Sequence, residues 1–502
     1  MQPVAPLLQL IVVPIVLAPI TYAVGRGAGK HTGWLAFATS LYMLVLIGLV
    51  GLHVHEYGSL TESYTWAPLA GMSFNLLADG LNIWVLATIV LLCMVTSVYS
   101  IRYMEHRISE MYEGDYKPAH ATYYALYLLY EAGMVGTVLS TNLIQFYLFY
   151  ELMLVPSWAL INNYGYGDRE RIGIMYFLWT HVGAVLLLAG ILTAYTITGS
   201  FDMTSLSLVE SMAGRCVATL VMFAILIGFF VKMAVFILHI WLPYAHAEAP
   251  TPISALLSPA MIGIGGYAIA RIVIENMYNL FATYSLVFAV WALVTMVYGG
   301  LMAMAQDDIK RFLAYSSISQ MGYLFLGLAS VSTLGVAGAM FHYVSHGLGK
   351  CILFSVAGIL ICQVGTRSIK KLGGLAAKMP ATATLCIIGF LTIAGVPPTS
   401  GFMSKWILFL GVFSTALSDS STSMLVVGII AIIMTIITVA YAFWTIKRVF
   451  FGPLPEELKD VKEAPAIMLA PLFLLAVVSI LVGIYPRAVT DFLVQFLSGV
   501  LP

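Results

Sequence analysis

The sequence predicts an all-α integral membrane protein with about fourteen transmembrane helices, and three observations lead to this fold class. Hydrophobic residues make up 61% of the 502 residues and charged residues only 9%, whereas a soluble domain carries roughly 25% charged residues. Runs of about 20 apolar residues, the length that crosses a bilayer, recur along the whole chain. The connections between them are too short to hold a soluble catalytic domain.

The apolar runs place the predicted helices in order along the chain. They lie near residues 6–24, 33–53, 80–101, 119–138, 141–161, 172–198, 217–239, 251–274, 282–304, 309–328, 334–362, 383–410, 425–450 and 467–485. The longest polar connections are 54–79, 102–118 and 452–466. We interpret the first run as a retained helix rather than a signal peptide, because no basic segment precedes it and many further spans follow.

The positions of the basic residues test these boundaries and predict an orientation. With this set of helices, seventeen of the 23 Lys and Arg residues fall on one face, and only Arg215, Arg271 and Arg487 fall on the other. Because cytoplasmic loops are enriched in Lys and Arg, the basic face is predicted to be cytoplasmic, with both termini on the outer face. The lysines that remain lie inside predicted helices, and they are Lys232, Lys350 and Lys405.

Composition and motifs exclude several classes of function. The formal net charge is zero, so the chain lacks the basic surface of a nucleic-acid-binding protein, and the lipid bilayer is its main partner. The five cysteines occur singly, without the spacing of iron–sulfur or zinc sites. The segment GRGAGK at 25–30 has neither the spacing nor the Ser or Thr of a phosphate-binding loop. We therefore expect no metal or cofactor in this chain, and any function must lie within the membrane.

Charged residues in the apolar helices are the first candidates for function, because a charge at mid-bilayer costs several kcal/mol, of order 3 or more. Glu151 lies in FYLFYELMLVPSW, a helix otherwise free of charge. Burial favours its neutral acid and a nearby lysine favours its carboxylate, so its proton affinity can be changed by a neighbour. The alternative is a static ion pair that holds two helices together.

Lys232 and the residues that follow it form a second candidate site. His239 lies seven residues further on, about 10 Å along the same face of a continuous helix. Pro243 then predicts a break in the helix at mid-depth, because proline lacks an N–H and interrupts the hydrogen-bond ladder. His246 follows the predicted break. A buried lysine that can be neutral or charged is a suitable proton carrier.

The segment FHYVSHGLGK is the third candidate. His342, His346 and Lys350 recur at every fourth residue, so they form a stripe about 12 Å long on one face of a helix. Three titratable groups in line predict a proton relay. The alternative is structural, with each histidine bonded to a backbone carbonyl.

A second broken helix is predicted in AGVPPTSGFMSKW, where Pro397 and Pro398 precede Lys405. Two interrupted hydrophobic segments, five helices apart, are typical of inverted-repeat transporters. We therefore divide the chain into an N-terminal three-helix region and two five-helix repeats, followed by a C-terminal helix and tail. These units span residues 1–118, 119–275, 282–450 and 451–502.

Two further buried residues are possible accessory groups. Glu131, in LLYEAGMVG, is predicted to lie within the membrane, and its partner cannot be identified from the sequence. His181, in FLWTHVGAV, is more simply interpreted as a core histidine with its hydrogen bonds satisfied.

Several ordered motifs resemble one known family. The segments FYELMLVP, LHIWLPYAHAEAPTPISALL, AQDDIKRFLAYSSISQMGY, HGLGKCILF, LGGLAAKMP and GVPPTSGFMSKW are similar to the antiporter-like subunits of respiratory complex I. The resemblance runs from about residue 79 to 486 and is greatest to the M-type subunit, the bacterial counterpart of mitochondrial subunit four, and to the D subunit of Mrp antiporters. The same family includes the D subunit of Mrp sodium/proton antiporters and subunits of membrane-bound hydrogenases.

The resemblance implies roles for the candidate residues. It implies that Glu151 and Lys232 form a proton-gating pair, with His246 beside the broken helix. It places the stripe that ends at Lys350 in a central relay and Lys405 in an exit half-channel. Two departures from the family pattern concern Gly263, where many relatives carry a bridging lysine, and Lys405, where the bacterial M-type subunit has glutamate.

We therefore expect a proton-translocating membrane-arm subunit of a complex I-like enzyme that transfers electrons from NADH or a related donor to quinone. Redox cofactors and quinone are expected in partner subunits, not in this chain. The alternatives are a subunit of an Mrp-type Na⁺/H⁺ antiporter or of a membrane-bound hydrogenase, and a passive scaffold for neighbouring transporters. We expect the transported ion to be a proton, and Na⁺ is the alternative. The location is the cytoplasmic or another energy-transducing membrane.

Overall fold

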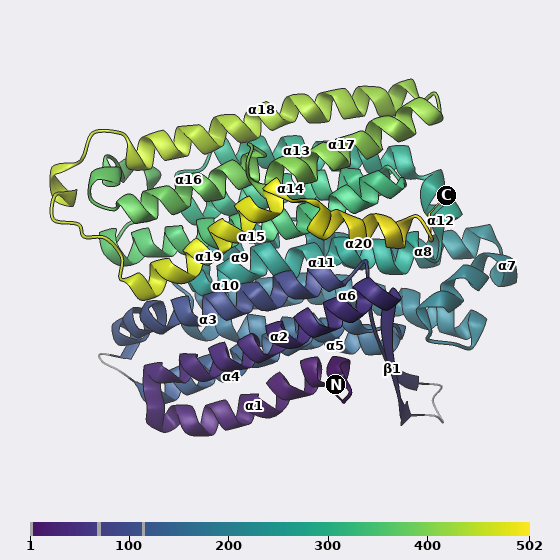
Figure 1. Cartoon of the computed structure of the whole chain (residues 1–502), viewed down its shortest axis with the longest axis horizontal. Coiled ribbons are helices and arrows are strands. Elements are labelled where there is room, and N and C mark those ends of the chain that lie inside the picture. The colour runs from purple at the N-terminus through teal and green to yellow at the C-terminus, as the bar shows by residue number, and fades with distance from the viewer. Residues whose placement is uncertain (1–3, 68–71, 113–115, 502) are drawn as a thin grey trace.

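The computed structural model describes residues 4–67, 72–112 and 116–501, and in it long helices lie side by side (Figure 1). The prediction that both termini lie on the outer face stays a prediction, and the strands lie towards one end of the long helices (Figure 1). Residues 1–3 and 502, to which that prediction also refers, lie outside the described residues. We call the end with the strands the hairpin face. The opposite end, which carries the loops that follow residues 28, 304 and 450, is called the basic face.

Every predicted segment contains at least one helix, and one further helix, α9, lies between the predicted segments 217–239 and 251–274. These helices are α1 (Pro6–Ala28), α2 (Gly33–Tyr57), α3 (Ile83–Tyr112), α4 (Lys117–Leu139), α5 (Leu143–Tyr164), α6 (Arg169–Thr198), α8 (Arg215–Met233), α9 (Trp241–Glu248), α10 (Thr251–Leu256), α11 (Ile262–Ala268), α13 (Ser285–Met304), α14 (Ile309–Ala329), α15 (Thr333–Val364), α16 (Pro380–Ala394), α17 (Ser400–Ser418), α18 (Thr422–Phe450) and α19 (Ala466–Ile484). The π-helical segments η4 (Leu257–Met261) and η5 (Ile269–Ile274) make α10 and α11 part of one helical run. Shorter helices that were not predicted are α7 (Val209–Ala213), α12 (Tyr278–Thr283) and α20 (Arg487–Leu497).

The all-α membrane fold class is confirmed. Among the described residues, 11 helical segments are long and apolar enough to cross a membrane, and the first of them contains both α1 and α2. The helices α4 and α14 are not among the 11, and α16 has only 15 residues. The count of fourteen spans, the inverted repeats and the domain boundaries therefore stay predictions.

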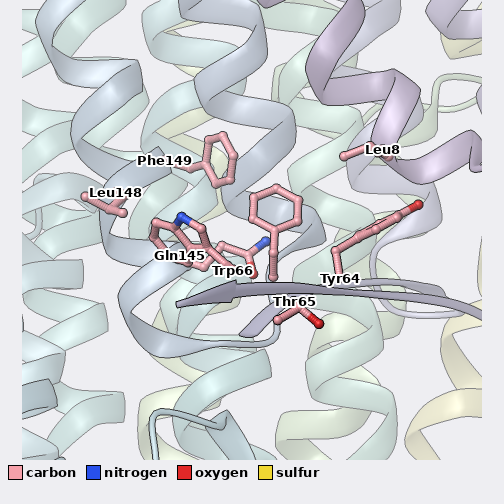
Figure 2. A pocket seen from close by; sticks show the side chains of 8 residues that line it. Leu8, Tyr64, Thr65, Trp66, Gln145, Leu148 and Phe149 are labelled. Atoms are coloured by element: carbon pink, nitrogen blue, oxygen red, sulfur yellow. The ribbon is translucent and has the colours of Figure 1, made fainter. Parts of the chain in front are cut away.

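The predicted loop 54–79 contains a β-hairpin. Strand β1 (Ser59–Ala67) pairs antiparallel with β2 (Met72–Asp79), with Ser59 opposite Asp79. The carboxylate of Glu62 on β1 accepts hydrogen bonds from the backbone N–H groups of Leu7 and Leu8, at 2.8 and 2.9 Å. These are free N–H groups of the first turn of α1, so the hairpin caps that helix. Beside it, an apolar cavity of about 480 Å³ opens between β1, α1 and α5 (Figure 2).

The first break in a membrane helix is confirmed, but it lies earlier than Pro243. Helix α8 ends at Met233, and the chain is irregular until α9 begins at Trp241. Pro243 is the third residue of α9, where its missing N–H costs nothing because the first four N–H groups of a helix have no partner within it. The expectation that Lys232 and His239 share one helical face is therefore wrong, because His239 lies in the linker.

Three tryptophans satisfy the carbonyl groups that this break exposes. The indole N–H groups of Trp241, Trp291 and Trp179 donate to the backbone oxygens of Val231, Phe236 and Leu238, at 2.9, 3.1 and 3.0 Å. A carbonyl without a partner is costly within a membrane, and irregular backbone persists there only where the protein satisfies it. The indoles therefore allow the linker to exist at this depth.

Replacing Trp291 with phenylalanine should destabilise the linker. The change keeps an aromatic ring but leaves the Phe236 oxygen without its donor, which costs about 1–3 kcal/mol. We expect a lower thermal unfolding midpoint for the purified protein in detergent. Trp84→Phe is the matched control, because the Trp84 indole nitrogen has no hydrogen-bond partner among the described residues. An equal decrease in both variants would contradict the proposed role of the indole.

The second predicted break is confirmed as well. Helix α16 ends at Ala394 and α17 begins at Ser400. Gly395 closes α16 with a φ of 76°, a left-handed conformation that glycine adopts without steric cost. Lys405 therefore lies in the second turn of a half-helix that begins inside the membrane.

Candidate functional site

Glu151 on α5 is paired with a histidine and not with the predicted lysine. Its Oε2 lies 3.3 Å from Nδ1 of His181 on α6, and its Oε1 has no hydrogen-bond partner in the described part of the chain. The side chain of His181 is 41% exposed. The interpretation of His181 as a core histidine is therefore wrong, and it is instead the direct partner of Glu151.

Lys232 is completely buried near the end of α8. Its Nζ lies 4.5 Å from the ring centre of Tyr150, the residue next to Glu151. In residues 4–67, 72–112 and 116–501, this Nζ has no hydrogen-bond partner, and no ion pair of 4 Å or less joins it to Glu151. Glu151 is nevertheless the charged group that acts electrostatically on Lys232. Because neither group is saturated by hydrogen bonds, their interaction can be gained or lost with little other rearrangement.

His246 on α9 connects the first broken helix to α15. Its ring stacks on Phe354 with 4.7 Å between ring centres, and neither ring nitrogen has a hydrogen-bond partner among the described residues. Phe354 lies one helical turn beyond Lys350, and Lys350 and Lys310 are the cations that act on the His246 ring. The imidazole therefore connects α9 to the helix that carries the central stripe.

The predicted stripe on α15 is present and buried. The ring centres of His342 and His346 are 6.3 Å apart, and both nitrogens of His346 are without a hydrogen-bond partner in the described structure. Lys350 donates hydrogen bonds to the Leu313 backbone oxygen at 2.9 Å and to Ser316 Oγ at 2.7 Å. For His346, the alternative in which a backbone carbonyl satisfies the ring is not what the structure shows.

Lys405 uses a carbonyl that the second break exposes. Its Nζ donates to the backbone oxygen of Ile393 at 2.8 Å and lies 4.3 Å from the ring centre of Tyr323. The preceding residue, Ser404, lies 3.2 Å from Nδ1 of His342. The first two turns of α17 thus contact the stripe through Ser404 and contact the end of α16 through Lys405.

The position of the absent lysine is filled by an aromatic ring. A Cβ atom on Gly263 would lie 2.2 Å from Cδ2 of Tyr343, so no longer side chain fits there without displacing the ring. The Tyr343 hydroxyl donates to the Ala260 backbone oxygen in η4 at 3.1 Å. In this chain, Gly263 therefore allows α11 and the Tyr343 ring of α15 to pack closely.

The two remaining predicted residues, Glu131 and His239, have hydrogen-bond partners that are not among the candidate residues. Glu131 on α4 accepts a hydrogen bond from Ser40 Oγ on α2 at 2.8 Å, a partner that the sequence did not suggest. His239 lies 3.1 Å, through Nε2, from the hydroxyl of Tyr298 on α13. Both side chains are buried, and neither contacts the other candidates through a hydrogen bond that the described structure contains.

Two buried cations were assigned to loops by the sequence interpretation, and this assignment is wrong. Lys310 is fully buried in the first turn of α14, where it donates to the Ala249 backbone oxygen. The predicted helix 309–328 already contained Lys310, and its position inside a predicted membrane helix was the sequence feature that could have indicated its burial. Arg271 in η5 is also buried, and its guanidinium donates to both carboxylate oxygens of Asp79, each at 2.6 Å.

The comparisons with known proteins cover nearly the whole chain. A family model described as NADH:quinone oxidoreductase/Mrp antiporter, TM, matches residues 140–449. F(420)H(2) dehydrogenase subunit M of Methanosarcina mazei is 31% identical over 99% of this chain and 97% of its own. NADH-quinone oxidoreductase subunit M of Rhodobacter capsulatus is also 31% identical, over 95% and 93%.

Solved structures share the fold. A chain of the Mrp complex from Dietzia sp. superposes with a TM-score of 0.86 at 22% identity, covering 98% of this chain and 97% of that one. A chain of respiratory complex I from Thermus thermophilus gives 0.82 at 24% identity, with 98% coverage of both. With the family match over residues 140–449 and relatives 31% identical over almost their full length, this chain belongs to the NADH:quinone oxidoreductase/Mrp antiporter family of membrane proteins.

Proposed function

We propose that this chain is a proton-translocating membrane subunit of a redox-driven complex. The observation that carries the proposal is a row of titratable side chains, buried except for the partly exposed Glu151, that passes through both broken helices. Its members, in order, are Glu151, Lys232, His246, Lys350, His346, His342 and Lys405. Relatives named as subunit M of NADH-quinone oxidoreductase and of F(420)H(2) dehydrogenase support a redox partner, which would hold the redox cofactors and the quinone site.

The row supports a mechanism in which protons move as charges rearrange. When Glu151 exchanges His181 for Lys232, the lysine gains a counter-ion and holds its proton more firmly, and when Glu151 returns, Lys232 releases the proton towards His246. The stripe then passes it from Lys350 to His342, and Ser404 leads to Lys405. Moving one charge against 100 mV costs about 2.3 kcal/mol, which is within the range of one ion pair in a partly buried site.

Glu151→Gln should reduce proton translocation by about tenfold or more, because an amide cannot supply the charge that acts on Lys232. The variant keeps the size of the side chain, so the chain should still assemble with its partners. Proton uptake by inverted membrane vesicles, started with the electron donor of the complex, measures proton translocation. The amount of this chain that co-purifies with the peripheral subunits measures assembly.

The same preparation separates the alternatives. Redox subunits in the purified complex, with proton uptake that does not require Na⁺, support the proposal. A complex without redox subunits, whose proton movement requires Na⁺, would instead identify an antiporter. Loss of assembly in Glu151→Gln, with normal turnover in the complexes that remain, would indicate a scaffold.

A further inference from the structure

The interface between α3 and α4 has a polar part near the basic face. On each helix the polar residues recur every three or four positions, so they lie on one side of the helix. We call this set the polar seam, and it consists of Tyr103, Ser100, Thr96 and Cys93 on α3 and of Tyr123, Tyr127 and Glu131 on α4. All seven side chains are fully buried.

Hydrogen bonds connect the polar seam to the basic face. The hydroxyl of Tyr103 lies 2.6 Å from that of Tyr166, in the loop between α5 and α6, and 2.9 Å from Thr251 Oγ1. Deeper in the membrane, Ser100 Oγ lies 3.0 Å from the hydroxyl of Tyr123. One turn further, the Tyr127 hydroxyl donates to the Cys93 backbone oxygen at 2.5 Å. These separate contacts lie at successive turns from Tyr166 inwards, and the last hydroxyl, that of Tyr127, lies one helical turn from Glu131.

Beyond Glu131, towards the hairpin face, the described residues of the same helices contain no comparable row of hydroxyl groups. Apart from Thr88 and Thr137, the buried side chains there are apolar, among them Val85, Leu86, Ile89 and Val90 on α3 and Met134, Val135, Val138 and Leu139 on α4. The hydroxyls there bond to their own helix, as Thr137 does with the Gly133 oxygen at 2.7 Å. The polar seam is therefore open at one end only.

Glu131 is the acidic group at the closed end. Its Oε2 accepts the hydrogen bond of Ser40, its Oε1 has no hydrogen-bond partner, and no cation within the described ranges lies within 4 Å of it. The groups that face it are Ser40 from α2, Cys93 from α3 and Tyr127 from its own helix. An isolated carboxylate is so unfavourable in an apolar interior that the neutral acid is the form held there.

We propose that Glu131 is a proton-binding site loaded from the basic face through the polar seam, separate from the row that begins at Glu151. The protonated carboxyl keeps its hydrogen bond from Ser40. Its proton exchanges along the hydroxyl groups of Tyr123, Ser100 and Tyr103. A sodium ion is a poorer occupant, because Ser40 and Glu131 supply too few oxygen ligands for a hard cation.

Infrared difference spectroscopy of the purified complex tests this site. We expect a carbonyl band of a protonated carboxyl group that disappears in Glu131→Gln and shifts in Glu131→Asp, which keeps the acid. On transfer to D₂O, the band should exchange about tenfold more slowly in the double variant Ser100→Ala/Tyr123→Phe, equivalent to a barrier raised by about 1.4 kcal/mol. The matched control is Thr137→Val, on the far side of Glu131, which should leave the exchange rate unchanged.

The outcomes are distinct. Absence of the band from the unmodified complex, or its persistence in Glu131→Gln, would overturn the assignment of a protonated Glu131. Exchange at the original rate in the double variant, or equal slowing in Thr137→Val, would overturn the polar seam as the route. The measurement uses the resting complex, so its result does not depend on whether the complex translocates protons.

Discussion

Replacing Lys232 with alanine should abolish proton translocation while leaving the complex assembled. The Lys232 ammonium lies on the Tyr150 ring and donates no hydrogen bond within the described residues, so its removal leaves no acceptor without a donor. The structural cost is then limited to the cavity left by the shortened side chain. The functional cost is large, because Glu151 loses the only lysine on which it acts in the first half of the row.

Proton uptake and electron transfer should be measured together in vesicles that contain the Lys232→Ala complex. We expect uptake to fall at least about tenfold, and electron transfer to fall with it if the two are coupled. Lys370→Ala, which changes an exposed lysine in a loop of the basic face, is the control for charge alone. Normal proton uptake and normal coupled electron transfer in Lys232→Ala would refute the proposed row.

Asp79→Ala should prevent stable folding of the chain. Arg271 is buried and pairs with Asp79 and with Glu275, whose Oε2 lies 3.0 Å away. Asp79 also accepts hydrogen bonds from the N–H groups of Leu81 and Asn82, so it fixes the start of α3. Removing one member of a buried ion pair costs about 3–5 kcal/mol, a large share of the roughly 5–15 kcal/mol that stabilises a typical folded domain.

The quantity to measure is the amount of folded chain in the membrane, together with its thermal unfolding midpoint in detergent. The double variant Asp79→Leu/Arg271→Met should recover much of the loss, because it removes both charges. Arg215→Ala serves as the control, since among the described residues the side chain of that exposed arginine bonds only to Thr283 Oγ1, at 2.8 Å. If Asp79→Ala folded as well as Arg215→Ala, the pair would have no structural role.

Hydrophobic run lengths predicted the helices well, but the position of the first break depended on interactions that they do not contain. Pro243 indicated that α8 and α9 are separate, but the chain leaves the helix at Ala234, which has a φ of 54°. The irregular residues that follow bond to Trp179 and Trp291, which come from other helices. At the second break, Gly395 and the two following prolines coincide, and the prediction was accurate.

The candidate site was predictable in its members and less so in its contacts. Buried lysines and histidines in apolar helices are visible in the sequence because each costs free energy there. Their partners depend on packing between distant segments, as with His181 and Glu151 or with Tyr343 and Gly263. Lys310 was missed because a residue two positions from a loop can be exposed or buried, and only tertiary packing decides which.

Ser404 and Lys405 are consecutive residues of α17, the helix that follows the second break. Ser404 touches His342, and Lys405 holds the Ile393 oxygen on the far side of the linker. One helix therefore holds the contacts of the last two members of the row, His342 and Lys405, and any change in its position would alter both contacts together.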